Sequence, residues 1–552
     1  MSESSSANPP VPPPEMHRAH HLSRAQEETG GFDVIVVGGG ATGLGAAVDA
    51  ATRGYRTLLV EQEDFAKGTS SRSTKLVHGG VRYLKQMNIS LVLEALHERG
   101  LLARNARHLA HSQDFVIPSY TQFNRGFYGI GLKVYDKLAG KLGLNPSKIL
   151  SRARTLRMLP NLEPGHLVGG VLYQDGQFDD SRLAVNLAQT AVREGACVLN
   201  YTRCSGFRKE NGKIVGVELE DRIGGENFTV GAKAVINATG IFVDQLRHAD
   251  EASAEKRVTV SQGIHLVLPR KFLPGEAAIM VPKTADGRVL FGVPWHDRVI
   301  FGTTDTPRTQ AQLEPRALHE ERDFVLEHAA KYLEKDPSET DILSVYAGLR
   351  PLVSAGSGTK TSSLSRDHTI LVSDSGLISI TGGKWTTYRK MAVDVVNKAA
   401  ESARLPQKES GTEHLTIHGS AEHLPTPTGT GDTMEVYGTD APGIQALEAE
   451  QPELAKPIHD RLPYRRSEVV WHARHEMAQT VEDVLARRTR AVILDARAAA
   501  EAADTVADLL ARELQRDEAW ARQSAEHFRE IAAGYDFANP ASTAHESVGK
   551  VA

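Results

Sequence analysis

The stretch at residues 33–61, DVIVVGGGATGLGAAVDAATRGYRTLLVE, decides the fold. DVIVV at 33–37 is a short, continuous apolar run, which is typical of a strand buried on both faces of a parallel sheet. Small residues with helical spacing follow as far as Gly54, and TLLVE at 57–61 forms a second apolar run. We therefore predict a strand–helix–strand unit that opens a doubly wound α/β fold.

The glycines of this unit match the pattern G-x-G-x-x-G, with Gly38, Gly40 and Gly43 at its fixed positions. The pattern alone is weak, but here it follows a strand, opens a helix and has Glu61 about twenty residues further on. Gly38 permits the turn, Gly40 lets the backbone approach a pyrophosphate, and Gly43 lets the helix pack closely on the strand. The helix N-terminus offers N–H donors to phosphates, and Glu61 would accept hydrogen bonds from a ribose. The sequence therefore predicts a dinucleotide site.

Length and composition limit the other functions that this chain could have. It has 552 residues, 40% hydrophobic and 24% charged, which is typical of a multidomain globular protein. A formal net charge of −5 gives no global positive field, so no nucleic-acid partner is expected. With Cys197 and Cys204 as its two cysteines, the chain has no disulfide framework, and a cytoplasmic location is expected. No apolar run approaches the ~20 residues of a membrane span, so membrane contact would be at the surface.

The character of the sequence changes along the chain and predicts five parts. Residues 1–31, rich in Ser, Pro and charge, are expected to be a disordered tail. Residues 32–404 are expected to form one body in which a Rossmann-like domain is interleaved with an antiparallel-sheet substrate domain, the latter built from short strands at about 265–305. Residues 405–443 resemble a linker, residues 444–536 an all-helical C-terminal domain, and residues 537–552 a flexible tail.

Two later segments bear on which dinucleotide binds. ATG at 238–240 follows a strand, and Thr239 and Gly240 could pass beside the pyrophosphate or the adenosine. TGGKWTTYRK at 381–390 is a second glycine turn that opens a helix, with Gly382, Gly383 and Thr386 in or next to the turn. A helix N-terminus aimed at a flavin would stabilise the negative charge of its reduced form. Binding elements spread from residue 38 to residue 390 fit FAD better than a nicotinamide cofactor that exchanges at every turnover.

Several cationic residues in glycine- or proline-flanked motifs are candidates for binding an anion. They are Arg82 in HGGVRYL, Arg350 in YAGLRPL, Arg366 in LSRDH and Lys384 in GGKWTTYRK. His265, in SQGIHLVLP, begins an apolar strand. It is either a hydrogen-bonded core residue or a neutral imidazole placed to take a proton from a hydroxyl. The histidines of the N-terminal tail have no preformed geometry, so we predict no metal site.

The stretches VVGGGATGLGAAVDAATRG, TSSRSTKLVHGGVRYL, INATGIFVD, FGTTD, YAGLRPL and TGGKWTTYRK, in this order, resemble the FAD-dependent glycerol-3-phosphate dehydrogenases. The similarity runs from about residue 32 to about residue 400, and the helical tail resembles that family's C-terminal domain more loosely. The combination of HGGxRYL with GGKxTTYRK is specific to this group. The resemblance implies FAD held non-covalently, oxidation of sn-glycerol 3-phosphate to dihydroxyacetone phosphate, and transfer of electrons to a membrane quinone.

The resemblance also implies roles for particular residues. It places Arg82, Tyr83, Arg350, Arg366 and Lys384 near the substrate phosphate and hydroxyls. It makes His265 the candidate base. Our own hypothesis is that Arg350 is the principal phosphate clamp, and whether His265 or Lys384 acts as the base is left open. A hydroxyl-rich loop would run along the flavin; it includes Thr69, Ser70, Ser71 and Lys75, and the Gly79–Gly80 pair follows it.

Membrane contact and other activities remain open at this stage. The segment 124–143 places Lys133, Lys137 and Lys141 on one stripe of a helix. This helix is either an ordinary surface helix or one that lies on a membrane surface. In the second case the protein would sit at the inner face of the cell membrane. The oligomeric state is open, a homodimer included. The main alternative activity is a glycerol-3-phosphate oxidase that releases hydrogen peroxide. A flavin-dependent amino-acid or amine oxidase is less favoured, because such an enzyme needs fewer cations. A regulator with a vestigial dinucleotide fold is least favoured, because every motif is intact.

Overall fold

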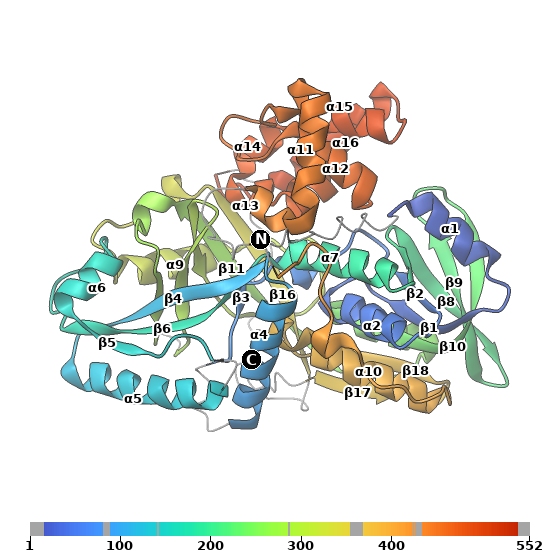
Figure 1. The fold of residues 1–552 in the computed structure, drawn as a ribbon, viewed down its shortest axis with the longest axis horizontal. Helices are drawn as coiled ribbons and strands as arrows, with labels where there is room; N and C mark the ends of the chain where they lie inside the picture. The colour runs from blue at the N-terminus through green and yellow to red at the C-terminus, as the bar shows by residue number, and fades with distance from the viewer. Residues whose placement is uncertain are drawn as a thin grey trace, which may run out of the picture.

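The computed structural model describes residues 16–80, 89–140, 143–284, 287–353, 368–422, 424 and 433–538. They form three units that pack together, as Figure 1 shows: a domain with a parallel sheet, a domain with an antiparallel sheet, and a helical domain that covers the junction of the two. The chain passes from one sheet domain to the other more than once, so each sheet contains strands from separate parts of the sequence. The predicted α/β architecture with a helical C-terminal domain is confirmed.

The first sheet has the strand order β17-β18-β10-β1-β2-β7. Its central strands are β1 (Phe32–Val37), β2 (Thr57–Val60) and β10 (Asn227–Asn237), and β1 pairs in parallel with both neighbours. The outer strands are β7 (Cys197–Leu199), β18 (Leu377–Gly382) and the antiparallel edge strand β17 (His368–Val372). The helices α2 (Ala41–Thr52), α7 (Asp180–Arg193) and α10 (Tyr388–Ser402) pack together beside it. The apolar run at 33–37 is therefore the buried centre of this sheet, as its composition predicts.

The second sheet has the order β15-β11-β14-β13-β12-β4-β6-β3, with β16 paired to β11 and β5 paired to β6. Its strands are β3 (Leu76–Val77), β4 (Ala110–Ser119), β5 (Lys148–Ser151), β6 (Gly169–Phe178), β11 (Val258–Pro269), β12 (Ala278–Val281), β13 (Leu290–Trp295), β14 (Arg298–Gly302), β15 (Thr306–Arg308) and β16 (Ser344–Val353). The short strands predicted at about 265–305 are β11 to β14, and their mutual pairing is antiparallel. Four helices contact the strands of this second sheet: α4 (Ile89–Asn105), α5 (Gln122–Ala139), α6 (Arg152–Met158) and α9 (His319–Ala330).

The helical domain contains α11 (Ala441–Glu450), α12 (Arg466–His475), a π-helical turn η11 (Asp483–Arg488), α13 (Ala491–Leu494), α14 (Ala496–Glu501), α15 (Ala503–Glu513) and α16 (Glu518–Ala532). Its core includes Val469, Val492, Leu510 and Phe528, all fully buried. The same core reaches Ile300 of β14 and Tyr346 of β16, so the helical domain and the antiparallel sheet share one hydrophobic cluster.

Three of the predicted domain boundaries differ from the structure. The disordered tail expected at 1–31 contains the helix α1 (Arg18–Glu27), which packs beside β7. Arg18 donates to the carbonyl oxygens of Asn200 and Tyr201 and pairs with Asp221. These tertiary contacts outweigh the polar composition on which the prediction depended.

The predicted linker at 405–443 is irregular, as expected, but its described part lies against the body. Leu405 and Ile417 are buried there, Ile417 N–H donates to the carbonyl oxygen of Asn105, and α11 already begins at Ala441. Phe537, predicted to open a flexible tail, is buried against His319, whereas residues 539–552 lie outside the described part of the chain.

Candidate active site

One cavity runs between the two sheet domains and brings together the motifs that the sequence analysis selected. At one end it is lined by Gly38, Gly40 and Glu61, and at the other by His265, Arg350 and Lys384. The chain segments that line it are the end of β1, the loop after β2, the ends of β10 and β18, and the adjoining strands β11 and β16. Residues more than 340 positions apart in the chain therefore share one site.

The first end has the geometry of a phosphate-binding turn. Gly38 has φ +114°, a conformation that L side chains rarely adopt, and it ends β1. A Cβ on Gly43 would lie 1.8 Å from the Gly38 carbonyl oxygen, so only glycine lets α2 begin this close to the strand. Helix α2 begins at Ala41, whose N–H donates to Ser70 Oγ at 2.9 Å. The predicted packing role of Gly43 is confirmed, and the N-terminus of α2 faces the cavity that Gly40 and Ala41 line.

Glu61 sits at the end of β2 and is held by the backbone. Its carboxylate accepts from Gly39 N–H at 2.6 Å and from Glu63 N–H at 2.9 Å. Burial raises the pKa of Glu61 to about 7, although these two hydrogen bonds oppose the rise. Since each carboxylate oxygen can accept more than one bond, the group can still receive ribose hydroxyls from the cavity.

The hydroxyl-rich loop divides between the cavity and the protein behind it. Thr69 and Ser70 line the cavity, and Ser70 is further fixed because Trp385 Nε1 donates to its carbonyl oxygen at 2.8 Å. Lys75, predicted to lie along the flavin, is not among the residues that line the cavity: its ammonium group is fully buried and donates to Asp180 and to the Ser71 carbonyl oxygen. Ser71 is also buried and absent from the cavity lining, and its carbonyl oxygen accepts from Lys75 and Arg490.

The Gly79–Gly80 pair also has a structural position. A Cβ on Gly79 would lie 2.4 Å from Tyr135 Oη and from Leu96 Cδ2, so this glycine makes room for close packing beside α4. Gly80 has φ +74°. Neither of these predicted cofactor residues is among those that line the cavity.

The remaining predicted cofactor residues form the opposite wall. Thr239 and Gly240 follow β10. Gly382 ends β18, Gly383 follows it, and Thr386 lies in the 3-10 turn Trp385–Thr387. All five line the cavity. Because β10 and β18 neighbour each other in parallel, their carboxyl ends open at the same edge of the sheet as that of β1.

His265 lies in β11 at the second end of the cavity. Its Nε2 is 2.8 Å from Thr74 Oγ1, and its ring stacks on Tyr346 with centroids 4.7 Å apart. A Cβ on Gly302 would meet the imidazole at 2.2 Å, so a glycine in β14 makes room for the ring. Burial lowers the pKa of His265 well below its ordinary value, and the charges of Arg350 and Lys75 lower it further. The imidazole is therefore neutral and can accept a proton.

Arg350, in β16, lines the same cavity as His265. Its guanidinium donates to Thr303 Oγ1 at 3.0 Å and to the Thr304 carbonyl oxygen at 3.1 Å, and it lies 3.3 Å from Asp305. A Cβ on Gly263 would lie 2.2 Å from the guanidinium, so a glycine in β11 lets the side chain lie flat. Lys384 lines the cavity with it. The predicted substrate residues Arg82, Tyr83 and Arg366 lie outside the described residues.

Sequence reasoning missed the polar groups that hold these side chains. The Asp305 side chain is only 7% exposed and accepts from Ser261 as well as from Arg350, so it holds the guanidinium in place, and Thr74 contacts the imidazole. The sequence signal was the motif FGTTD, in which the acidic residue Asp305 lies three positions after the end of β14. Among the residues that the structure describes, no group of three or more His, Cys, Asp or Glu side chains could hold a metal ion.

Comparison with known proteins agrees with this geometry. The model of a family described as FAD dependent oxidoreductase matches residues 33–389, and the model described as the C-terminal domain of alpha-glycerophosphate oxidase matches residues 382–521. The mitochondrial glycerol-3-phosphate dehydrogenase of Bos taurus is 38% identical over 92% of this chain and 74% of its own length. That of Arabidopsis thaliana is 38% identical over 91% of this chain and 86% of its own length.

A solved structure shares the whole architecture. The glycerol-3-phosphate dehydrogenase of Bacillus halodurans, solved in complex with FAD, aligns over 95% of this chain and 98% of its own with a TM-score of 0.76 and 28% identity. The alignment therefore includes the helical domain as well as both sheets. The cavity, with its glycine turn, helix N-terminus and Glu61, fits FAD.

Proposed function

Because the chain belongs to the FAD-dependent glycerol-3-phosphate dehydrogenases, we propose that it oxidises sn-glycerol 3-phosphate to dihydroxyacetone phosphate and passes the electrons to a membrane quinone. The observation that supports the substrate assignment is that Arg350, Lys384 and a neutral His265 line the same cavity. A dianionic phosphate needs cations, and a secondary alcohol that is oxidised needs a proton acceptor beside its hydroxyl.

Each of these residues has one task in the proposed reaction. When bound, FAD supplies the hydride acceptor. Arg350, held by Asp305 and Thr303, binds the phosphate and so fixes the distance of the reacting carbon from the His265 side of the cavity. His265 Nε2, beside the Thr74 hydroxyl, takes the proton of the substrate hydroxyl. Lys384 adds a second positive charge near the same anion and is the other candidate for the proton acceptor.

Arg350→Ala tests the substrate assignment. We expect kcat/KM for glycerol 3-phosphate to fall at least about 30-fold, because truncating one partner of a desolvated charge pair costs about 2 kcal/mol or more. Arg257→Ala, an exposed arginine just before β11, is the matched control and should leave kcat/KM unchanged. A wild-type kcat/KM in Arg350→Ala would remove Arg350 from the site.

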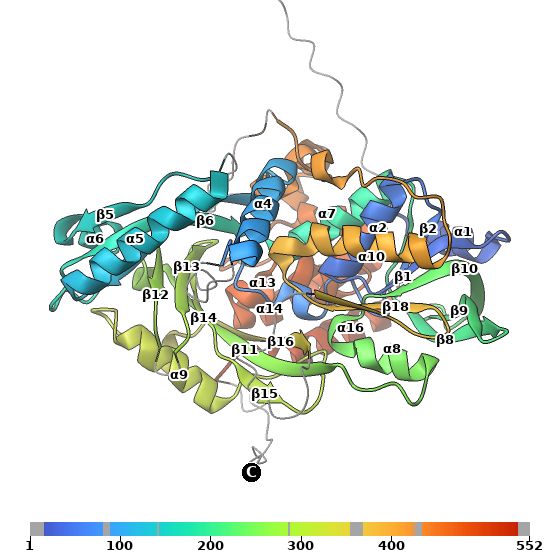
Figure 2. The same ribbon diagram turned by 90° about the horizontal axis from the view of Figure 1, so that it is seen from below.

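The acceptor is proposed from the family and from one surface of the molecule. Helix α5 turns Leu132 and Tyr135 inwards, and the apolar side chains exposed along its outer face are Phe123, Phe127, Ile130 and Val134. Lys133 and Lys137 are exposed beside this stripe, whereas Lys141 lies outside the described residues. In Figure 2 the helix runs along the edge of the molecule far from α1. Exposed apolar groups flanked by lysines suit an anionic lipid surface, where a quinone would be reached.

Two measurements test the acceptor. Reduced enzyme should be reoxidised slowly by air and quickly by a quinone analogue, whereas stoichiometric hydrogen peroxide would indicate the oxidase instead. The variant Ile130→Ser/Lys133→Glu/Lys137→Glu should lose flotation with vesicles that contain anionic phospholipid. The control Lys271→Glu/Lys331→Glu changes two exposed lysines elsewhere and should keep it. Equal flotation of the two variants would exclude α5 as the membrane surface. Among the described helices, none is long and apolar enough to cross a bilayer.

A further inference from the structure

The loop from Asp64 to Lys75, here called the cofactor loop, forms a large part of the cavity wall but has little regular structure of its own. Its one helical element is the short 3-10 turn Thr69–Ser71. Near its start Ala66 has φ +60° and at its end Lys75 has φ +61°, conformations that residues with a side chain rarely adopt. Such a loop keeps its shape only when contacts outside it over-determine that shape.

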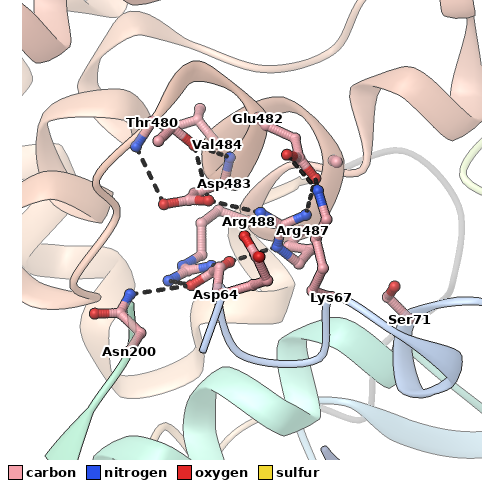
Figure 3. Close-up of polar contacts among 12 residues, drawn as sticks. Asp64, Lys67, Ser71, Asn200, Thr480, Glu482, Asp483, Val484, Arg487 and Arg488 are labelled. Atoms are coloured by element: carbon pink, nitrogen blue, oxygen red, sulfur yellow. Dashed lines mark hydrogen bonds and ion pairs between the residues drawn. The ribbon is translucent and has the colours of Figure 1, made fainter. Parts of the chain in front are cut away.

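Those contacts come from the helical domain, at the π-helical turn Asp483–Arg488. Figure 3 shows the carboxylate of Asp64 pointing at the two arginines of the turn. Arg488 donates through both terminal nitrogens, at 2.5 and 2.9 Å, and Arg487 donates through Nε at 2.5 Å. Burial alone would raise the pKa of Asp64, but the charges of Arg488 and Arg487 outweigh burial and hold that pKa below its ordinary value.

A second contact holds the middle of the loop. Lys67 Nζ lies 2.5 and 2.6 Å from the two carboxylate oxygens of Glu482. Glu482 in turn accepts from Arg487 at 2.6 Å, which joins this pair to the Asp64 cluster (Figure 3). Lys67 itself lines the cavity. The pair therefore extends from the wall of the cofactor cavity directly to the helical domain.

A third contact holds the end of the loop. Arg490 is fully buried, with φ +66°, and donates to the Ser71 carbonyl oxygen at 2.6 Å and to Asp180 at 3.2 Å. Lys75 donates to the same carbonyl oxygen at 2.8 Å, and Asp180 also accepts from Ser73 N–H at 3.0 Å. The next residue, Thr74, contacts His265. Arg490 is thus linked to the imidazole of His265 in three steps: its hydrogen bond to the Ser71 carbonyl oxygen, the backbone from Ser71 to Thr74, and the contact between Thr74 and His265.

A contribution to the stability of domain packing does not explain why these ion pairs are present. Their side chains are almost entirely removed from water, and a buried ion pair is often no more stabilising than apolar residues of similar volume. The same interface already has an apolar cluster that joins the helical domain to β14 and β16. What the charged groups add is direction. Arg487 and Arg488 end on Asp64 of the cofactor loop, and Glu482 ends on Lys67. Arg490 ends on the Ser71 carbonyl oxygen of the loop as well as on Asp180 of α7.

We propose that the segment Glu482–Arg490 of the helical domain is a positioning element for FAD: it fixes the cofactor loop from outside, so the helical domain is part of the cofactor site. Its residues touch neither FAD nor substrate. They act through Asp64, Lys67 and Ser71, and the loop then presents Thr69 and Ser70 to the cofactor. This inference concerns the cofactor and is independent of the substrate and acceptor proposed above.

The test compares Arg490→Met with Arg490→Lys in the full chain. Apoprotein is titrated with FAD by flavin fluorescence, and hydrogen exchange of the backbone amides of residues 66–74 is measured with and without FAD. Arg490→Met should raise the dissociation constant of FAD at least tenfold and speed exchange in the loop. Arg490→Lys, which keeps a donor for the Ser71 carbonyl oxygen, should recover most of the affinity. The control Arg298→Ala removes a contact of β14 with the Leu494 and Arg461 carbonyl oxygens of the same domain and should change neither quantity.

Glu482→Gln is the second variant, because it keeps the size of the side chain and removes one charge. It should raise the dissociation constant of FAD at least threefold and speed exchange at residues 66–68. If Arg490→Met does not fold, Glu482→Gln decides. Wild-type FAD affinity together with wild-type exchange in the loop, in Arg490→Met or in Glu482→Gln, would overturn the proposal and leave the segment as ordinary domain packing.

Discussion

Single residues at the two ends of the cavity owe their charge to their surroundings. Glu61 is pushed towards its neutral form by burial, and His265 is held neutral by burial and by nearby cations. Both states follow from burial, since desolvation disfavours whichever form is charged. Ligand binding and proton transfer at this site should therefore depend on pH in ways that single substitutions can change.

Binding of FAD should weaken as the pH falls through about 7, the value to which burial raises the pKa of Glu61. The ribose hydroxyls are donors and favour the charged carboxylate, so protonation of Glu61 must be reversed when FAD binds. We expect the dissociation constant to rise by up to about tenfold per pH unit below that value. FAD titrations between pH 6 and 8 would measure this, and Glu61→Gln should bind weakly at all pH values without the slope. A wild-type affinity that is constant over this range would contradict the role of Glu61.

The acid limb of kcat/KM should shift when Arg350 loses its charge. Arg350 lowers the pKa of His265, so Arg350→Gln should raise that pKa towards its ordinary value and move the limb to higher pH. Arg350→Lys keeps a positive charge and should leave the limb near its wild-type position. The variants are compared by the pH at which kcat/KM falls on the acid side, not by their maximal kcat/KM. An acid limb at the same pH in both variants would mean that another group accepts the proton.

At the scale of elements, the approach of α2 to β1 and β10 creates the binding turn. Gly43→Ala should prevent FAD binding and lower the free energy of unfolding by about 1–3 kcal/mol, because the new Cβ would overlap the Gly38 carbonyl oxygen and force the helix outwards. Gly131→Ala on α5 is the control, since a Cβ there meets no atom within 4 Å. Denaturant unfolding with FAD titration gives both quantities. A Gly43→Ala protein that binds FAD like the wild type would show that the turn can relax.

Elements with strong local signals were predictable from the sequence, and the contacts that override local signals were not. The run at 33–37, the glycine turns at 38–43 and 381–384 and the strands at 265–305 carry apolar periodicity and glycine positions that require them. The helix α1 gave no such signal, because Arg18 depends on carbonyl oxygens of residues 200 and 201. The position of Lys75 was missed for the same reason: its partner Asp180 is more than a hundred residues away in the chain.

At the scale of the whole molecule, all three units bear on one cavity. The parallel-sheet domain contributes Gly38 and Glu61 to its lining, and the antiparallel sheet contributes His265 and Arg350. The helical domain, by our proposal, fixes the loop between them through the contacts drawn in Figure 3. Sequence motifs located the first two contributions, because each motif contains the residues that line the cavity. The third could not be found in this way, since the arginines at 487–490 act on a loop more than four hundred residues earlier.

The central claim is that this cavity holds FAD at one end and glycerol 3-phosphate at the other. The most direct test is the visible spectrum of the purified protein under anaerobic conditions, before and after glycerol 3-phosphate is added. We predict a yellow flavin band that bleaches with this substrate, and bleaches far more slowly in Arg350→Ala. A flavin band that glycerol 3-phosphate leaves unchanged, in protein shown to be folded and loaded with FAD, would contradict the account.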